Sequence, residues 1–215
     1  LISLLHRESR GTHPRVARHA HVPLQSGSDS VLRRMHRRYR PWHYAERLTR
    51  IRAACPDAAI GADVMIGFPG ETAPEFQESY DFIAAQPLTY LHLFPFSARP
   101  GTTGWELHCH SPVPAAVKER MAALRGLIDR KNLAFRSGFI GKHLSAVTLV
   151  TAKEPSSRYE NTHSQRNGTA AMTDNFLPVE IAANLEPNTL VTVQITGLTA
   201  HGLHGTISGG IRSIA

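Results

Sequence analysis

The chain has 215 residues, 41% of them hydrophobic, and a formal net charge of +7. This size suits one large domain or a medium and a small one, and no run nears the roughly 18 apolar residues of a membrane span, so we expect a cytoplasmic protein without membrane contact. Cys55 and Cys109 are too few for a disulfide framework or a four-thiolate site. Because the chain starts with Leu1, we expect it to begin inside a longer reading frame.

The positive charge is concentrated in the first two thirds of the chain. Residues 1–142 hold 20 Lys and Arg against 12 Asp and Glu, whereas residues 143–215 hold 4 against 5. Most of the excess lies between residues 33 and 52. Such a segment either binds a polyanion through phosphate contacts or forms a solvated helix surface, and both interpretations stay open. The candidate RNA-binding residues are Arg33, Arg34, Arg37 and Arg38.

The first structural signal is a short apolar run that turns into a helix. Residues 22–24 predict a buried strand, and Gly27 would let a ligand approach the backbone closely. Ser28 and Asp29 are expected to cap a helix over residues 28–38, whose N-terminus attracts carboxylates or phosphates. On chemistry alone, this is either an anion site or an ordinary strand-to-helix turn.

A second strand–helix unit follows. Pro41 begins a helix that Pro56 ends, and residues 58–68 are almost continuously apolar, which predicts a strand covered by helices on both faces. Thr72 and Glu75 form a capping box for the next helix, which ends at Pro87.

Residues 90–96 predict a third strand, and residues 115–140 a long helix. This alternation predicts an α/β fold with parallel strands, so the loops that begin near Gln25, Gly67 and Ser97 should share one edge, where such folds bind ligands. From His143 the sequence changes to short β-prone runs separated by Gly, Asn, Pro and Ser, which predicts a small all-β barrel or sandwich. We therefore expect two domains, 1–142 and 143–215.

Four motifs in this order resemble one family. They are His21-Val-Pro-Leu-Gln-Ser-Gly-Ser-Asp, Met35-His-Arg-Arg-Tyr, Asp63-Val-Met-Ile-Gly-Phe-Pro-Gly-Glu-Thr and Phe94-Pro-Phe-Ser-Ala-Arg-Pro-Gly-Thr. Together they resemble the second half of the partial (β/α) barrel in the radical S-adenosylmethionine (SAM) domain of tRNA methylthiotransferases. The tail resembles that family's small TRAM-like RNA-binding β-barrel. Its Thr173-Asp-Asn-Phe fits best with the branch that acts on threonylcarbamoyladenosine, and the isopentenyladenosine branch is the alternative.

The resemblance implies that a 4Fe-4S cluster cleaves SAM reductively and that a methylthio group is added to carbon 2 of a tRNA adenosine beside the anticodon. The family's Cys-x3-Cys-x2-Cys motif is absent from this sequence. We therefore expect a chain that needs the missing N-terminal portion, takes tRNA as its partner and is inactive alone. No catalytic residue is assigned.

Carried over by position, the resemblance also implies a pocket for SAM and substrate. Phe94 would pack on an adenine unless it is a core residue, Glu71 would orient a polar partner unless it only supports a helix start, and Arg99 would meet a carboxylate or phosphate unless it is a plain surface residue. The implied pocket residues are Gln25, Ser26, Gly27, Ser28, Asp63, Gly67, Pro69, Gly70, Glu71, Phe94 and Arg99.

Other chemistries have weaker signals. Gly67-x-x-Gly70 lacks the Gly-Lys-Ser/Thr ending of a nucleotide-binding Walker loop. His19-x-His21 and His108-Cys-His lack a matched second pair, so we predict no metal site. A tRNA-binding module without chemistry competes as a function, whereas a phosphosugar enzyme would need a full barrel and a clear base that we do not find.

Overall fold

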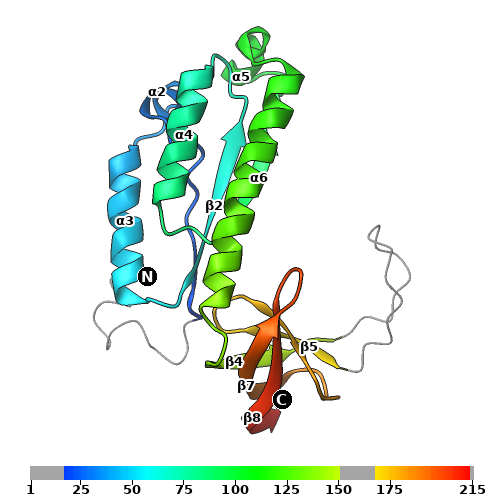
Figure 1. Cartoon of the computed structure of the whole chain (residues 1–215). Helices are drawn as coiled ribbons and strands as arrows, with labels where there is room; N and C mark the ends of the chain where they lie inside the picture. The colour runs from blue at the N-terminus through cyan, green and yellow to red at the C-terminus, as the bar shows by residue number, and fades with distance from the viewer. Residues whose placement is uncertain (1–16, 151–167, 214–215) are drawn as a thin grey trace. The chain divides into compact units, whose positions relative to one another are not determined.

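The computed structural model describes residues 17–150 and 168–213 (Figure 1). Contacts divide the chain into two compact units, Leu1–Asn132 and Leu133–Ala215, so the boundary falls inside the long helix α6 (Pro114–Ser137). The last turn of α6 belongs to the second unit because Phe135 packs on the core of that unit. The helix end expected over residues 1–10 lies outside the described residues.

The first unit contains a three-stranded parallel sheet in the order β1-β2-β3, as the strand–helix alternation predicts. Its strands are β1 (His19–His21), β2 (Ala59–Ile66) and β3 (Tyr90–Pro95). The apolar run at residues 22–24 predicts the first strand, whereas the regular strand β1 ends just before it, at His21. Backbone hydrogen bonds to β2 nevertheless continue past His21: the Val22 N–H donates to the Gly61 carbonyl at 2.9 Å and the Leu24 N–H donates to the Asp63 carbonyl at 3.2 Å.

Prolines and caps bound the helices of this unit as expected. Pro41 occupies the first turn of α3, and at the start of α4 the Thr72 hydroxyl accepts from the Glu75 N–H while the Glu75 carboxylate accepts from the Thr72 N–H. Helix α2 is shorter than predicted because the chain turns at His36, where φ is 54°. The bounds are α2 (Asp29–Arg34), α3 (Pro41–Ala54), α4 (Ala73–Ala85) and the unpredicted α5 (Thr103–Glu106) and 3-10 helix η1 (His108–His110).

The core of this unit lies on one face of the sheet. Alternate residues of β2, Ile60 to Ile66, pack against Leu48 of α3, Ile83 of α4 and Leu124 of α6, and Figure 1 shows these three helices on the same side of β2. The expectation of helices on both faces is therefore wrong for the described residues. The other face of β2 carries Asp63, and its neighbours there are polar or aromatic.

The second unit contains a closed five-stranded barrel in the order β4-β5-β6-β8-β7, which confirms the expected small all-β domain. Sequence patterns missed β5 and β8. Strand β8 is rich in glycine, and a side chain at Gly205 would lie 2.3 Å from Val193, so glycine is required for β8 to pack on β7. The strands are β4 (His143–Thr148), β5 (Thr169–Thr173), β6 (Pro178–Ile181), β7 (Thr189–Leu198) and β8 (Leu203–Ser213).

Among the described residues, no helix combines the length and apolar character needed to cross a bilayer.

Candidate functional site

The loops that follow the three parallel strands meet at one edge of the sheet, as predicted. Gln25 forms a bridge with Val64, and its carbonyl accepts from the Met65 N–H at 2.9 Å. The rings of Phe68 and Phe96, from the next two loops, pack edge to face at 5.5 Å. Gln25 has a φ of 67°, an unusual conformation for a residue other than glycine.

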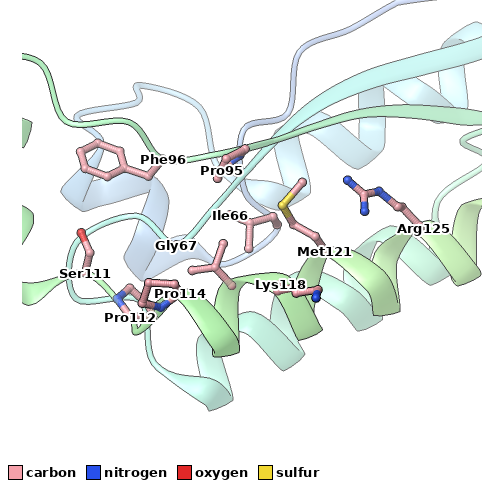
Figure 2. Close-up of a pocket in the computed structure, with 11 residues that line it drawn as sticks. Ile66, Gly67, Pro95, Phe96, Ser111, Pro112, Pro114, Lys118, Met121 and Arg125 are labelled. Atoms are coloured by element: carbon pink, nitrogen blue, oxygen red, sulfur yellow. The ribbon is translucent and has the colours of Figure 1, made fainter. Parts of the chain in front are cut away.

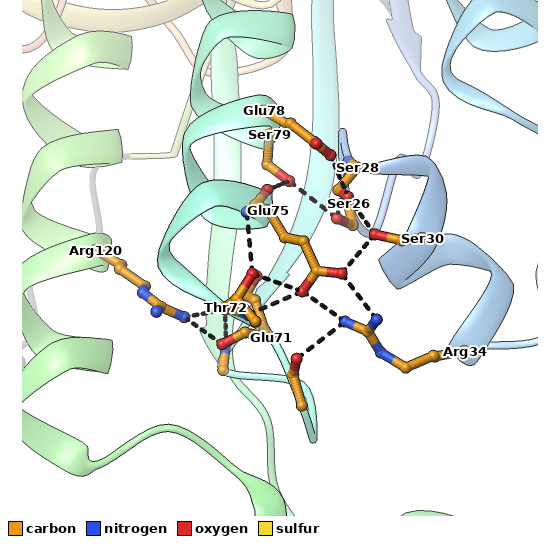
Figure 3. Close-up of polar contacts among 12 residues, drawn as sticks. Ser26, Ser28, Ser30, Arg34, Glu71, Thr72, Glu75, Glu78, Ser79 and Arg120 are labelled. Carbon is orange, nitrogen blue, oxygen red and sulfur yellow. Dashed lines mark hydrogen bonds and ion pairs between the residues drawn. The ribbon is translucent and has the colours of Figure 1, made fainter.

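The loop at residues 25–28 is packed against α4 (Figure 3). The hydroxyls of Ser26 and Ser79 are 3.0 Å apart, the Gly27 N–H donates to Ser79 Oγ at 3.2 Å, and the Ser28 hydroxyl donates to Glu78 at 2.6 Å. Ser28 is the N-cap residue of α2, but its side chain makes no capping hydrogen bond. The polar groups of Ser26, Gly27 and Ser28 therefore bind protein partners rather than face an open cavity.

Gly27 serves the packing of a helix and not the approach of a ligand. A Cβ at this position would lie 2.8 Å from Ser79 Cα and 2.9 Å from Phe82 Cβ. The expectation that Gly27 keeps the backbone open for a ligand is thus corrected: α4 occupies that space.

Arg34 clamps α2 to α4. Its guanidinium donates to both carboxylate oxygens of Glu75 at 2.8 Å and to the Gly70 carbonyl at 3.2 Å, and Ser30 also donates to Glu75 (Figure 3). The hydrogen bonds from Arg34 lower the pKa of Glu75 to about 2. Arg34 was expected to bind RNA, but this bidentate pair commits its charge to Glu75.

Because Arg34 and Glu75 form this ion pair, we expect the stability of the folded chain to fall in acid. The pKa of Glu75 falls from 4.5 to about 2 on folding, so its stabilisation is present above pH 4.5 and is lost as the pH falls toward 2. Urea unfolding of the wild type and Glu75→Gln should show a stability difference at pH 6 that shrinks steadily below pH 4.5. A difference that stays constant down to pH 2.5 would contradict the assignment.

Glu71 is buried beneath the loop that follows β2. Its carboxylate accepts from the Gly67 N–H at 2.8 Å and from Arg120 of α6 at 2.7 Å, and its side chain is 1% exposed. Burial raises the pKa of Glu71, while the Gly67 N–H and Arg120 oppose that rise. Glu71 therefore holds the loop closed and ties it to α6, rather than facing a ligand.

A cavity of about 450 Å³ lies between the ends of β2 and β3 and the first turns of α6 (Figure 2). Its walls are mostly apolar, including Ile66, Val117 and Met121, with Lys118 and Arg125 on the helix side. Of the predicted pocket residues, Gly67 alone lines it. The phenylalanine at this cavity is Phe96, not Phe94.

The face of the sheet opposite the helices carries a second group of polar residues. Asp63 Oδ1 lies 3.1 Å from His21 Nε2 and 3.5 Å from His92 Nδ1. The Tyr90 hydroxyl is 2.7 Å from His19 Nε2 and 3.3 Å from His21 Nδ1. We call the residues of this surface the histidine face: His19, His21, Asp63, Tyr90, His92 and Phe94.

Among the predicted site residues, Asp63 and Phe94 lie on the histidine face. Their partners Tyr90 and His92 were not predicted as site residues, although their alternation along the strand was a usable signal. The remaining loop residues do not join them: Pro69 is buried, while Gly70 and Arg99 are exposed.

The arginine-rich segment divides into paired and unpaired cations. Arg33 pairs with Asp29 at 2.9 Å. Within the described residues, no carboxylate lies within 4.0 Å of four exposed guanidinium groups, and three of these border a hollow of about 500 Å³ with Tyr39, His43 and Glu46. We call these four the free arginines: Arg37, Arg38, Arg47 and Arg50.

The cysteines do not fit an iron–sulfur cluster. Cys55 is buried at the end of α3, and Cys109 is exposed in η1. Protein-bound 4Fe-4S clusters are held by a set of cysteine thiolates, typically four. Two cysteines on separate elements cannot supply that set, so no chemical step of this chain is assigned to a cluster of its own.

Curated relatives match most of the sequence at 34–36% identity. The tRNA-2-methylthio-N(6)-dimethylallyladenosine synthase of Acidothermus cellulolyticus is 36% identical over 93% of this chain and 39% of its own length, and that of Thermus thermophilus is 34% identical over 91% and 40%. The threonylcarbamoyladenosine tRNA methylthiotransferase of Bacillus subtilis is 35% identical over 77% and 35%. No protein-family model matches the sequence.

One solved structure, the radical SAM enzyme coproporphyrinogen III oxidase of Escherichia coli, aligns with a TM-score of 0.49 at 11% identity, over 90% of this chain and 44% of its own. A similarity of that size supports no conclusion. The chain spans about two fifths of the length of the curated relatives that it matches. Over that portion, it is related to the tRNA methylthiotransferases of both adenosine branches.

Proposed function

We propose that this chain is part of a tRNA methylthiotransferase that adds a methylthio group to carbon 2 of an N6-substituted adenosine by radical SAM chemistry. The observation that carries this proposal is the 36% identity to a tRNA-2-methylthio-N(6)-dimethylallyladenosine synthase across 93% of the chain. The cluster that such chemistry needs must come from outside the 215 residues, because the two cysteines here cannot hold it.

The dimethylallyl, or isopentenyl, form of adenosine is the first substrate to test. Relatives named for it match 91–94% of this chain, whereas a relative named for threonylcarbamoyladenosine matches 77%. The motif that favoured the other branch, at residues 173–176, shapes the turn between β5 and β6. There the Thr173 hydroxyl donates to Asn175 at 2.6 Å and the Thr173 N–H donates to the Leu177 carbonyl. A motif with this structural role is weak support for substrate choice.

The histidine face is our candidate surface for SAM and the target adenosine. Asp63 offers a carboxylate that is 25% exposed, and Phe94 offers a half-buried ring on the same face. A parallel sheet is ordinarily covered on both faces, so a face that no described helix covers fits a surface that another part of the enzyme encloses. The loop at residues 25–28 would support this surface from behind instead of contacting the ligands.

The free arginines are our candidate contacts for tRNA phosphates. They are exposed and have no carboxylate partner among the described residues, and α3, which carries Arg47 and Arg50, also carries Trp42, which is 57% exposed. Unpaired arginines bind phosphates, and an exposed indole stacks on unpaired bases. A tRNA-binding module without chemistry would use the same surface, so binding alone does not separate the two functions.

The purified chain should therefore be unable to start the reaction by itself. After anaerobic incubation with iron and sulfide, we expect no stoichiometric iron–sulfur cluster and no reductive cleavage of SAM to 5′-deoxyadenosine. A relative of full length, treated identically, serves as the positive control. Cluster-dependent SAM cleavage by this chain alone would overturn the proposal that the cluster ligands lie elsewhere.

A further inference from the structure

We propose that His21, Asp63 and His92 bind one divalent transition-metal ion, with Zn²⁺ as the test ion. The three residues come from three neighbouring strands, β1, β2 and β3, and share the sheet face opposite the core that α3, α4 and α6 form. Their ligand atoms all lie within 4.8 Å of one another, and they are the one such group of three among the described residues.

The distances suit a metal of this class. Ligands at about 2.0–2.2 Å from a tetrahedral Zn²⁺ are separated from each other by about 3.3–3.6 Å. Asp63 Oδ1 lies 3.1 Å from His21 Nε2 and 3.5 Å from His92 Nδ1. Two of the three distances between ligand atoms therefore need little change. The third distance, between the ring nitrogens of His21 and His92, can shorten if the His92 side chain rotates, and this side chain is 65% exposed.

The surroundings of His21 also suit a metal ligand. Metal-binding histidines usually donate their second ring N–H to a neighbouring acceptor, which fixes the tautomer. His21 presents Nε2 to Asp63 and Nδ1 to the Tyr90 hydroxyl at 3.3 Å, and Tyr90 in turn lies 2.7 Å from His19 Nε2. With a metal on Nε2, the Nδ1–H would donate to Tyr90, whose own O–H would donate to His19.

Two histidines and one carboxylate form a donor set that leaves coordination positions vacant for outside ligands. The set is distinct from the iron–sulfur chemistry of the proposed function, because it contains no thiolate. The site therefore needs neither SAM nor tRNA to be detected, and its failure would leave the proposed function untouched.

The test is a titration of the purified 215-residue chain with Zn²⁺ by calorimetry and with Co²⁺ by visible absorption. We expect one ion per chain. Asp63→Asn and His92→Ala should each weaken binding by more than about 10-fold, because even indirect partners of a metal ligand are worth that much. His201→Ala, which removes an exposed histidine from the barrel unit, and Cys109→Ser are the controls and should bind as the wild type does.

The outcomes separate this site from other sources of metal binding. His92 is exposed on its strand, so its replacement leaves the core intact, and circular dichroism checks the fold of each variant. The proposal is overturned if the wild type binds no ion, if His92→Ala and Asp63→Asn keep wild-type affinity, or if bound Co²⁺ shows a thiolate charge-transfer band that Cys109→Ser abolishes.

Discussion

Arg120→Ala should lower the free energy of unfolding by about 3–5 kcal/mol, because it leaves the Glu71 carboxylate buried without its cationic partner. Arg120 donates to that carboxylate at 2.7 Å and to the Glu71 carbonyl at 3.2 Å, and its guanidinium lies 5.4 Å from the centre of the Phe76 ring. Among the described residues, the Gly67 N–H is then the one remaining donor to the carboxylate, and a single hydrogen bond does not offset the cost of burying its charge.

The effect of Arg120→Ala should depend on pH. Without Arg120 the pKa of Glu71, already raised by burial, rises further. Above pH 4.5, the pKa of Glu71 in the unfolded chain, the ionised carboxylate lowers the stability of the folded state. This loss of stability becomes smaller as the pH falls toward 4.5. Urea unfolding at several pH values measures both the loss and its relief.

Arg125→Ala is the matched control for this variant. It removes the same charge from an exposed position one and a half turns along α6, and we expect a change within about 0.5 kcal/mol. The double variant Glu71→Gln with Arg120→Met should recover most of the loss, because Gln can still accept from the Gly67 N–H and no charge stays buried. If Arg120→Ala lowers the free energy of unfolding as little as Arg125→Ala does, the ion pair of Arg120 and Glu71 does not hold the loop after β2.

Reversing the charge of free arginines should weaken tRNA binding strongly and reduce its dependence on salt. Each phosphate contact contributes about 0.7–0.9 to the slope of log affinity against log salt, so a variant that loses two contacts should have a slope smaller by about 1.5 and an affinity lower by about 10-fold or more at low salt. We expect this of Arg37→Glu with Arg38→Glu and, separately, of Arg47→Glu with Arg50→Glu.

The control for these variants is Lys118→Glu with Arg125→Glu, which makes the same change in net charge at the cavity beside α6. Fluorescence anisotropy with labelled tRNA between 50 and 300 mM salt gives both affinity and slope. If the control weakens binding as much as the reversed arginines do, the effect comes from net charge and the free arginines form a solvated surface.

Local signals in the sequence were sufficient for most boundaries in the first unit. Pro41 and Pro56 bracket α3, and the capping box of Thr72 and Glu75 starts α4 where it was predicted. Prolines and capping residues act on neighbours within a few residues. The helix ends that they determine therefore depend little on the rest of the fold. The parallel order of the strands also followed from the alternation of strands and helices.

Contacts between distant residues could not be predicted in the same way. Arg34 has the sequence context of a free surface cation, but its partner Glu75 lies 41 residues further along the chain. The sequence around Gly27 suggests a place for a ligand, but the space beside it is filled by α4, which begins more than 45 residues further along the chain.

The histidine face also depends on contacts between residues that are far apart in the sequence. Residues 58–68 are apolar enough to suggest a strand buried on both sides, and Asp63 alone interrupts them. Its importance is visible once the register of the sheet sets His92 directly beside it on β3. Register depends on the pairing of whole strands, which a single sequence does not specify.

The most direct test of the proposed function joins this chain to the part of the Acidothermus cellulolyticus relative that it does not match. The hybrid, with its cluster restored, is incubated with SAM and with tRNA that carries dimethylallyladenosine, and the nucleosides are analysed by mass spectrometry. We predict the 2-methylthio derivative of that adenosine. A hybrid that holds its cluster, cleaves SAM and binds the tRNA, yet forms no methylthio product while the intact relative does, would contradict the proposal.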